Sequence, residues 1–425
     1  MKQTNLILEE VLKNINPNEN MDFIKKFLKE FIIKINSNIK KQKIIADIFV
    51  GGSFAKKTLI KKDKYDIDLF LRFDKKYPNS EISNMTKKLL GGIKGVKVVH
   101  GSRDYFSIKV KDNFIIEVVP VRKISKPSEA ENITDLSYSH VRYINKNVKT
   151  EKILNDIKIA KAFCYASNCY GAESYIKGFS GYSLELLVYH YKGFMNFIKA
   201  VLKINPNERE IIDTEKLYKN KKEVLLDMNT SKLISPIILV DPTFKQRNAL
   251  AALSKETLVK FQKHCAQFLK TPGVKSFEIK KVDLVKIKEN AIKNKNEFLL
   301  LEISTEKQEG DVAGSKLYKF YNHMSSELER YFVIKNKGFN YNNKQKARIF
   351  FVLKKREFVF FNGPFVKDRK NVIKFKKEHK KVLEKNKRLF AKEKFNFNSK
   401  DFVKKWKLKN KSKVSQMYIN EIKII

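Results

Sequence analysis

The sequence predicts a multidomain protein that combines α/β units with an α-helical unit. Its 425 residues are about three times the length of a typical single domain. Hydrophobic residues make up 42% of the chain and aromatic residues 12%, which is enough for several packed cores and excludes wholesale disorder. The spacing of the apolar residues alternates between helical and strand periods, and it predicts domains at residues 1–145, 146–270 and 271–425.

The first domain begins with helices and continues with strands. In residues 1–45, phenylalanines recur among lysines at helical spacing, which predicts one or two amphipathic helices. Runs rich in β-branched and aromatic residues then predict strands within 43–52, 65–73, 96–100, 105–111 and 114–121. We expect the last two strands to form a hairpin with its turn at Asp112–Asn113. This pattern is typical of a compact α/β domain.

The second domain is predicted to be mainly helical. From Lys152 onward, Ile153, Ile157, Ala160 and Cys164 lie on one face of a helix. Further elements are expected as follows: an apolar helix within 178–191, a short buried strand or extended piece at 236–243 and a helix at 249–269. The break at Thr271-Pro272-Gly273 marks the predicted boundary with the third domain.

The third domain is predicted to be a second α/β unit with a basic tail. Strands are expected at 298–304, 347–353 and 357–361, and a helix at 315–334. From Gly363 onward the chain is lysine-rich, and we expect it to be helical because apolar residues recur along it: Phe375, Val382, Leu389, Phe390 and Trp406. Whether the tail grips a partner or only completes the fold stays open at this point.

The charge of the chain favours a polyanionic partner. Lys and Arg number 89 against 46 Asp and Glu, a formal net charge of +43, which is most simply explained by binding to nucleic acid. The alternative is a lysine-heavy genome that adds lysine to every surface. Three cysteines without metal-ligand spacing, a polar N-terminus and no apolar stretch near the ~20 residues of a membrane span predict a cytoplasmic protein with no membrane role.

A Gly-Gly-Ser turn followed by two aspartates carries the strongest chemical signal. Ser53 follows Gly51 and Gly52, and Asp66 and Asp68 come 13 residues later in a predicted strand. Residues i and i+2 of a strand share a face, so both carboxylates point the same way. Paired carboxylates can hold the divalent ions used in phosphoryl transfer, and Mg²⁺ prefers such oxygen ligands. The turn ahead of them can present backbone N–H groups to phosphates.

Glu117 is the candidate third carboxylate. It interrupts an apolar strand, and its same-face neighbours Ile115 and Val119 are apolar. A carboxylate on such a face is costly unless a positive charge compensates it, which favours a metal ligand. The alternative is an edge strand whose charged residue points to water.

These segments resemble the polymerase-β-type nucleotidyltransferases, and more specifically the archaeal-type (class I) CCA-adding tRNA nucleotidyltransferases. The resemblance covers about residues 45–385 and rests on the following segments: 51–70 and 115–121 for the catalytic core, and 156–194, 236–254 and 363–375 for the narrower family. It implies a nucleotidyltransferase head, a helical neck, an α/β body and a basic tail. Glu117 departs from the pattern because the family usually has Asp there.

The resemblance also implies roles for individual residues. Asp66, Asp68 and Glu117 match its metal-binding carboxylates. The residues that match its nucleotide contacts are Gly52, Ser53, Lys56, His140, Lys161, Tyr170 and Arg247. From the sequence alone, Lys56 is equally well explained as a solvated loop lysine. On their own, His140 would more often be a structural histidine and Tyr170 a packing residue. The alternative for Arg247 is a simple surface charge in a loop before a helix.

The activity that the resemblance implies is template-independent addition of C, C and A to the 3′ end of tRNA. The implied substrates are CTP, ATP and tRNA, the last held by its acceptor arm and TΨC stem-loop, and the implied cofactor is Mg²⁺. Two alternatives are an RNA-tailing enzyme with another acceptor and an RNA-binding protein without catalysis. The intact Asp66 and Asp68 pair favours an enzyme. The resemblance leaves open whether the protein is a monomer or a homodimer.

Overall fold

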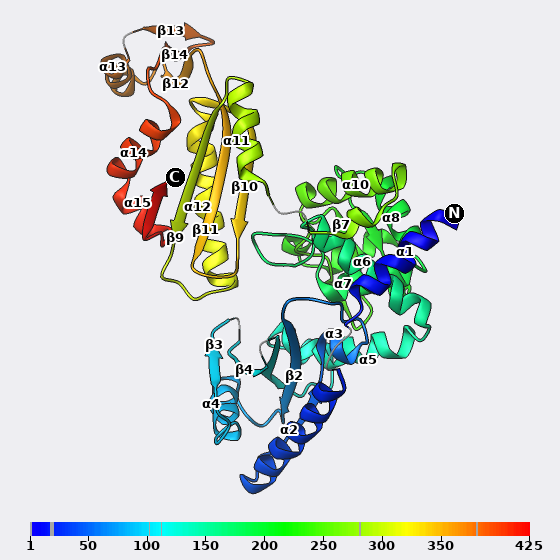
Figure 1. Ribbon diagram of the computed structural model, residues 1–425. Helices are drawn as coiled ribbons and strands as arrows, with labels where there is room; N and C mark the ends of the chain where they lie inside the picture. Colours follow the sequence, from blue (N-terminus) through cyan, green and yellow to red (C-terminus); the bar gives the residue numbers. More distant parts are fainter. Residues whose placement is uncertain (1, 18–20, 102, 112, 280–281, 380) are drawn as a thin grey trace. The chain divides into compact units, whose positions relative to one another are not determined.

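The computed structural model describes residues 2–17, 21–101, 103–111, 113–279, 282–379 and 381–425. The chain divides into two compact units, residues 1–280 and 281–425 (Figure 1). The predicted division between 1–145 and 146–270 stays a prediction, because both ranges belong to the first unit. In the described ranges, every helix is too short or too polar to serve as a membrane span.

The N-terminal half of the first unit is built on a mixed sheet. Its elements are α1 (Lys2–Ile15), α2 (Met21–Lys41), β1 (Ala46–Val50), α3 (Gly52–Ala55), β2 (Tyr65–Phe73), α4 (Asn79–Leu89), β3 (Val96–Val99), β4 (Tyr105–Lys111), β5 (Phe114–Arg122) and α5 (Ser137–Asn147). The strand order is β1-β2-β5-β4-β3, with β2 and β5 parallel and the other pairs antiparallel. The predicted hairpin of β4 and β5 is confirmed, although Asp112 of its turn lies outside the described residues.

The two faces of this sheet have different roles. Ile67, Leu69, Leu71 and Phe73 alternate along β2 and are fully buried on one face, together with apolar residues of α2 and α4. The residues between them point to the opposite face, as the strand period of two requires. This opposite face carries Asp66 and Asp68, so the packed core holds the carboxylates on a rigid strand.

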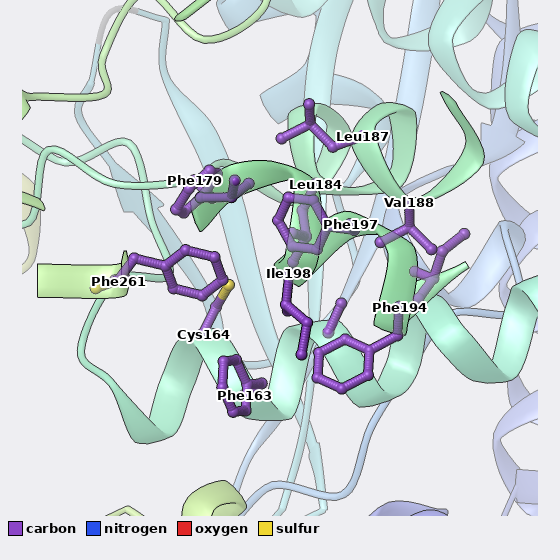
Figure 2. Close-up of a cluster of buried hydrophobic side chains, with 14 of the residues drawn as sticks. Phe163, Cys164, Phe179, Leu184, Leu187, Val188, Phe194, Phe197, Ile198 and Phe261 are labelled. Atoms are coloured by element: carbon purple, nitrogen blue, oxygen red, sulfur yellow. The ribbon is translucent and has the colours of Figure 1, made fainter. Parts of the chain in front are cut away.

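The second half of the first unit is a helical layer around a large aromatic core. Its elements are α6 (Glu151–Ala166), α7 (Gly181–His190), α8 (Phe194–Lys203), β6 (Glu210–Ile212), α9 (Lys221–Asp227), β7 (Ile237–Asp241), β8 (Phe244–Asn248) and α10 (Lys255–Lys270). Figure 2 shows side chains from α6, α7, α8 and α10 packed together, among them Phe163, Phe194, Phe197 and Phe261. The predicted helix at 249–269 is wrong in its start, because α10 begins at Lys255 after Ser254, whose side chain caps it.

The second unit is a separate α/β body. Its elements are α11 (Leu284–Lys293), β9 (Glu297–Ser304), α12 (Asp311–Glu329), β10 (Phe332–Tyr341), β11 (Lys346–Lys355), β12 (Val359–Phe365), α13 (Arg369–Glu378), β13 (Val382–Lys385), β14 (Arg388–Glu393), α14 (Ser399–Lys409), α15 (Lys411–Gln416) and β15 (Glu421–Ile424). The main sheet has the order β10-β11-β9-β15 and packs against α12. The predicted helix at 315–334 is wrong at its end, because the chain enters β10 at Phe332, which is fully buried in the core of this unit.

The tail is helical only in part: Phe375 lies in α13 and Trp406 in α14, as predicted, but strands β13, β14 and β15 lie between and after the helices. Val382, Leu389 and Phe390 lie in the small sheet β12-β14-β13, where each strand is stabilised by cross-strand partners. Trp406 of α14 packs near Phe320 of α12, and β15 pairs with β9 of the main sheet. The C-terminal residues therefore complete the fold of the second unit.

Candidate active site

Asp66, Asp68 and Glu117 lie on adjacent strands that run in the same direction. Asp68 of β2 is directly opposite Glu117 of β5 in the parallel register, and Asp66 is one step of the strand period before Asp68. All three side chains line one cavity of about 320 Å³ in the first unit. The predicted meeting of these carboxylates is therefore found in the structure.

Glu117 does not lie on an edge strand. Strand β5 lies between β2 and β4, so the edge-strand alternative is wrong. Burial, followed by repulsion from Asp68 and Asp66, raises the pKa of Glu117 to about 8. Burial also raises the pKa of Asp68 to about 6, against the attraction of Lys56. Carboxylates crowded in this way favour a cation among them.

Gly52 forms a tight turn against Asp68. Its φ is +58°, in the left-handed region that glycine adopts without steric cost. A Cβ atom at this position would lie 1.7 Å from Asp68 Oδ2, so only glycine fits. The turn is held by a hydrogen bond from the Gly51 N–H to the Asp68 carbonyl oxygen at 2.8 Å. Gly52 and Ser53 both line the cavity, as predicted.

The donor set around the cavity fits Mg²⁺. It consists of carboxylate oxygens in one register beside a glycine cradle that a Cβ atom would fill. Within the described ranges, no group of three or more His, Cys, Asp or Glu side chains forms a ready metal-binding group. Mg²⁺ commonly takes one or two carboxylates and adds water and substrate phosphates.

Two lysines and Glu185 form a buried ionic cluster at the cavity wall. Lys56 donates to Glu185 Oε2 at 2.6 Å, and Lys161 donates to Glu185 Oε1 at 2.9 Å. Burial alone would raise the pKa of Glu185, but Lys161 and Lys56 outweigh it and hold this pKa at about 2. Lys56 is 8% exposed, so the solvated-loop alternative for this residue is wrong.

Tyr170 lines the same cavity. Its ring stacks on that of Tyr165 with centroids 4.2 Å apart, and it is half-buried. A Cβ atom added at Gly181, the first residue of α7, would lie 2.8 Å from the Tyr170 hydroxyl oxygen. The structure therefore brings Tyr170 together with the carboxylates and lysines, as predicted, while also giving it a packing role.

His140 and Arg247 meet at a second cluster, centred on Asp241. Arg247 Nη1 donates to Asp241 Oδ2 at 2.6 Å, and His140 Nε2 lies 3.2 Å from the same oxygen. The Tyr182 hydroxyl donates to Asp241 Oδ1 at 3.0 Å, and the His140 and Tyr182 rings stack with centroids 3.9 Å apart. The predicted loop position of Arg247 is wrong, because it lies in β8, which turns back on β7.

Helix α7 connects the two clusters. Tyr182 and Glu185 are three residues apart, the spacing of neighbours on one helix face. Tyr182 contacts the Asp241 cluster and Glu185 the lysine cluster, and Lys56 Nζ lies 6.0 Å from the centre of the Tyr182 ring. Ser180 caps this helix by accepting from the Ser183 N–H at 3.2 Å. A short helix thus sets the position of both groups of predicted residues.

The sequence reasoning missed Glu185, Asp241 and Thr58. Each is a fully buried polar side chain, and the two acids stand in apolar runs. Like Glu117, Glu185 and Asp241 are charges in apolar runs, and such charges need a compensating partner. An acidic residue in an apolar run can be recognised from the sequence, but the residues that compensate its charge cannot.

Comparison with known proteins agrees with this geometry. Residues 155–278 match the second domain of the tRNA nucleotidyltransferase family. A CCA-adding enzyme of Methanococcus maripaludis is 30% identical over 320 residues, which is 72% of this chain and 69% of that protein. The chain belongs to the family of CCA-adding enzymes.

Two further relatives show how the similarity is distributed. The CCA-adding enzyme of Nanoarchaeum equitans is 44% identical over 53% of this chain, and the match spans 55% of that protein. The enzyme of Methanocaldococcus jannaschii is 28% identical over 91% of this chain and 86% of its own length. The predicted family is therefore confirmed by matches that extend over most of the chain.

Solved structures support the fold. A cytoplasmic RNA terminal U-transferase has a TM-score of 0.51 at 12% identity, covering 66% of this chain and 100% of its own. A structure of Cid1, described as an RNA terminal uridylyl transferase, has a TM-score of 0.51 at 13% identity, covering 66% and 99%. These likenesses confirm the predicted nucleotidyltransferase fold class.

Proposed function

We propose that this protein adds C, C and A in sequence to the 3′ end of tRNA, using CTP and ATP and releasing pyrophosphate. The observation that carries the proposal is one cavity lined by three carboxylates (Asp66, Asp68 and Glu117), the Gly52 turn and three lysines (Lys56, Lys62 and Lys161). The carboxylates suit activation of an attacking hydroxyl, and the lysines suit a triphosphate. Family membership supplies the substrate class.

Different residues of the cavity have different proposed roles in the reaction. Asp66, Asp68 and Glu117 would hold Mg²⁺, which would supply activation of the attacking 3′-hydroxyl and charge neutralisation for the leaving pyrophosphate. Gly52 and Ser53 bring backbone N–H groups to the phosphates at the start of α3. Lys56 supplies a positive charge beside them, and the ionic cluster keeps that charge in place.

Arg247 and His140 are proposed to contact the base of the nucleotide. Asp241 fixes the Arg247 guanidinium on one side, and the stack of His140 on Tyr182 fixes the imidazole. A planar guanidinium held in this way presents its remaining N–H groups in a fixed geometry, which suits base edges. Selection between CTP and ATP is therefore assigned to this cluster.

The excess of positive charge supports tRNA as the partner. A net charge of +43 attracts RNA phosphates without regard to sequence, as a substrate set of all tRNAs requires. The basic second unit is proposed to hold the acceptor arm and TΨC stem-loop. The free and buried thiols of Cys164, Cys169 and Cys265 favour a reducing compartment such as the cytoplasm.

The test is incorporation of labelled CTP and ATP, separately and together, into tRNA transcripts that end before C, after C and after CC. We expect Mg²⁺-dependent addition that stops after A and is abolished by EDTA. Asp66→Ala should lower the rate at least about a hundredfold, which corresponds to about 2.7 kcal/mol of transition-state stabilisation.

Asp63→Ala is the matched control, since Asp63 is an exposed acid three residues before Asp66. It should keep the wild-type rate. Open-ended addition of nucleotides would assign the protein to RNA tailing instead. Wild-type rates in Asp66→Ala would contradict the assignment of the carboxylates.

A further inference from the structure

The two lysines that contact Glu185 differ in how many hydrogen bonds their ammonium groups make. Lys161 Nζ lies 2.9 Å from Glu185 Oε1, 2.7 Å from Thr58 Oγ1 and 3.1 Å from the Thr58 carbonyl oxygen. An ammonium group has three N–H donors. All three N–H donors of Lys161 are therefore engaged by described residues. Lys161 is 2% exposed. Lys161 is built into the wall of the cavity.

The Lys56 ammonium group makes fewer hydrogen bonds to described residues than it has N–H donors. Within the described part of the chain, its ammonium group makes one hydrogen bond, to Glu185 Oε2 at 2.6 Å. Its two other N–H groups have no hydrogen-bond partner among the described residues, and Lys56 lines the cavity. Because Lys56 is 8% exposed against 2% for Lys161 and keeps unused donors, a triphosphate in this cavity can bind Lys56 more readily than Lys161.

Glu185 contacts Lys161 and Lys56 through different oxygen atoms of its carboxylate. Oε1 is anchored by Lys161 and by the Thr58 hydroxyl, which donates to it at 2.8 Å. Oε2 is left to hold Lys56. The carboxylate is fully buried and lies on α7, whereas Lys56 and Thr58 come from the segment after the Gly-Gly-Ser turn.

We propose that Glu185 is a positioning residue for the nucleoside triphosphate, because it is anchored by Lys161 and Thr58 and aims the Lys56 ammonium into the cavity. Lys161 acts through Glu185 and Thr58, in place of the direct nucleotide contact that the family resemblance implies. The inference rests on the proposed function, from which it takes the triphosphate as ligand.

Glu185→Gln isolates this role because it keeps the shape of the side chain. With the amide oxygen toward Lys161 and Thr58, the amide nitrogen faces Lys56 and replaces an acceptor by a donor. Lys56 then loses its partner. Loss of a hydrogen bond between charged groups predicts about tenfold weaker binding of CTP.

The experiment measures CTP binding to the full-length protein by isothermal titration calorimetry in Mg²⁺, and tRNA binding separately. We expect Glu185→Gln to weaken CTP about tenfold and tRNA less than about twofold. In a Lys56→Ala background the same substitution should add less than about twofold, because the two residues act as a unit. Glu215→Gln, an exposed glutamate away from the cavity, should bind CTP like wild type.

Unchanged CTP affinity in Glu185→Gln, or an equal loss in the Lys56→Ala background, would overturn the inference. If Glu185→Gln fails to fold, Glu185→Asp replaces it, since that variant keeps the charge but withdraws it from Lys56 by one methylene. It should also weaken CTP without weakening tRNA. Binding needs no turnover, so an inactive wild-type protein would refute the proposed function while these affinities still test Glu185.

Discussion

A methyl group added at Gly52 should disable nucleotide addition, because the backbone and Asp68 both exclude it. The φ of +58° costs a residue with a side chain about 1–2 kcal/mol. The new Cβ atom would lie 1.7 Å from Asp68 Oδ2, so the carboxylate must move by about 1 Å or more. Misplacement of a reacting group by about 1 Å lowers turnover about a hundredfold.

Gly92 provides the matched control. Its φ is +78°, and a Cβ atom there meets nothing within 4 Å. Gly92→Ala therefore carries the same kind of backbone strain without the contact. Both variants should lower the midpoint of thermal unfolding by a few degrees, measured by circular dichroism. Only Gly52→Ala should lose about a hundredfold in single-turnover incorporation of labelled CTP.

The comparison separates strain from displacement. Equal activity in the two variants would refute the argument that Asp68 must keep its place against the turn. A loss of activity in both would assign the effect to backbone strain alone. The expected difference in activity at similar stability would tie the function of Gly52 to the carboxylate.

Two further predictions follow from the charged clusters. In EDTA, stability should fall as pH rises from about 5 to 8, because the folded state holds protons on Asp68 and Glu117, with pKa values of about 6 and about 8, that the unfolded state has already released. Mg²⁺ should restore the midpoint of thermal unfolding at pH 8, and Asp68→Asn should reduce the dependence of stability on pH. A stability that does not change with pH would contradict the crowding of the carboxylates. Asp241→Asn should free Arg247 and raise incorporation of UTP or GTP about tenfold in product sequencing. Asp47→Asn removes the partner of Arg72, an arginine outside the cavity lining, and should leave selection unchanged.

Local patterns were sufficient where a residue's neighbours in sequence are also its neighbours in space. The alternation of β2 placed Asp66 and Asp68 on one face, and its buried partners are the ones expected. The apolar surroundings of Glu117 favoured a carboxylate facing other charged groups over an edge-strand residue facing water, and β5 lies inside the sheet. These predictions depend on strand geometry, which the chain carries locally.

Patterns failed where long-range contacts decide the element. Val382 and Leu389 have spacing that also suits a helix, yet they form short strands whose partners stabilise them. Phe332 continues an apolar helical pattern but joins β10, because the buried position in the sheet outweighs helical spacing. Arg247 lies in a strand that exists only because β7 and β8 pair.

The sequence by itself determined the family, the nucleotidyltransferase fold class and the carboxylates of the cavity, since these follow from residue types at fixed spacing. The tertiary structure decided which basic side chains of the site are paired and with which buried carboxylates. Glu185 meets Lys56 across 129 positions of sequence, and His140 meets Asp241 across 101. No local pattern encodes such pairs, because burial makes each charge depend on a partner that only the folded chain brings near.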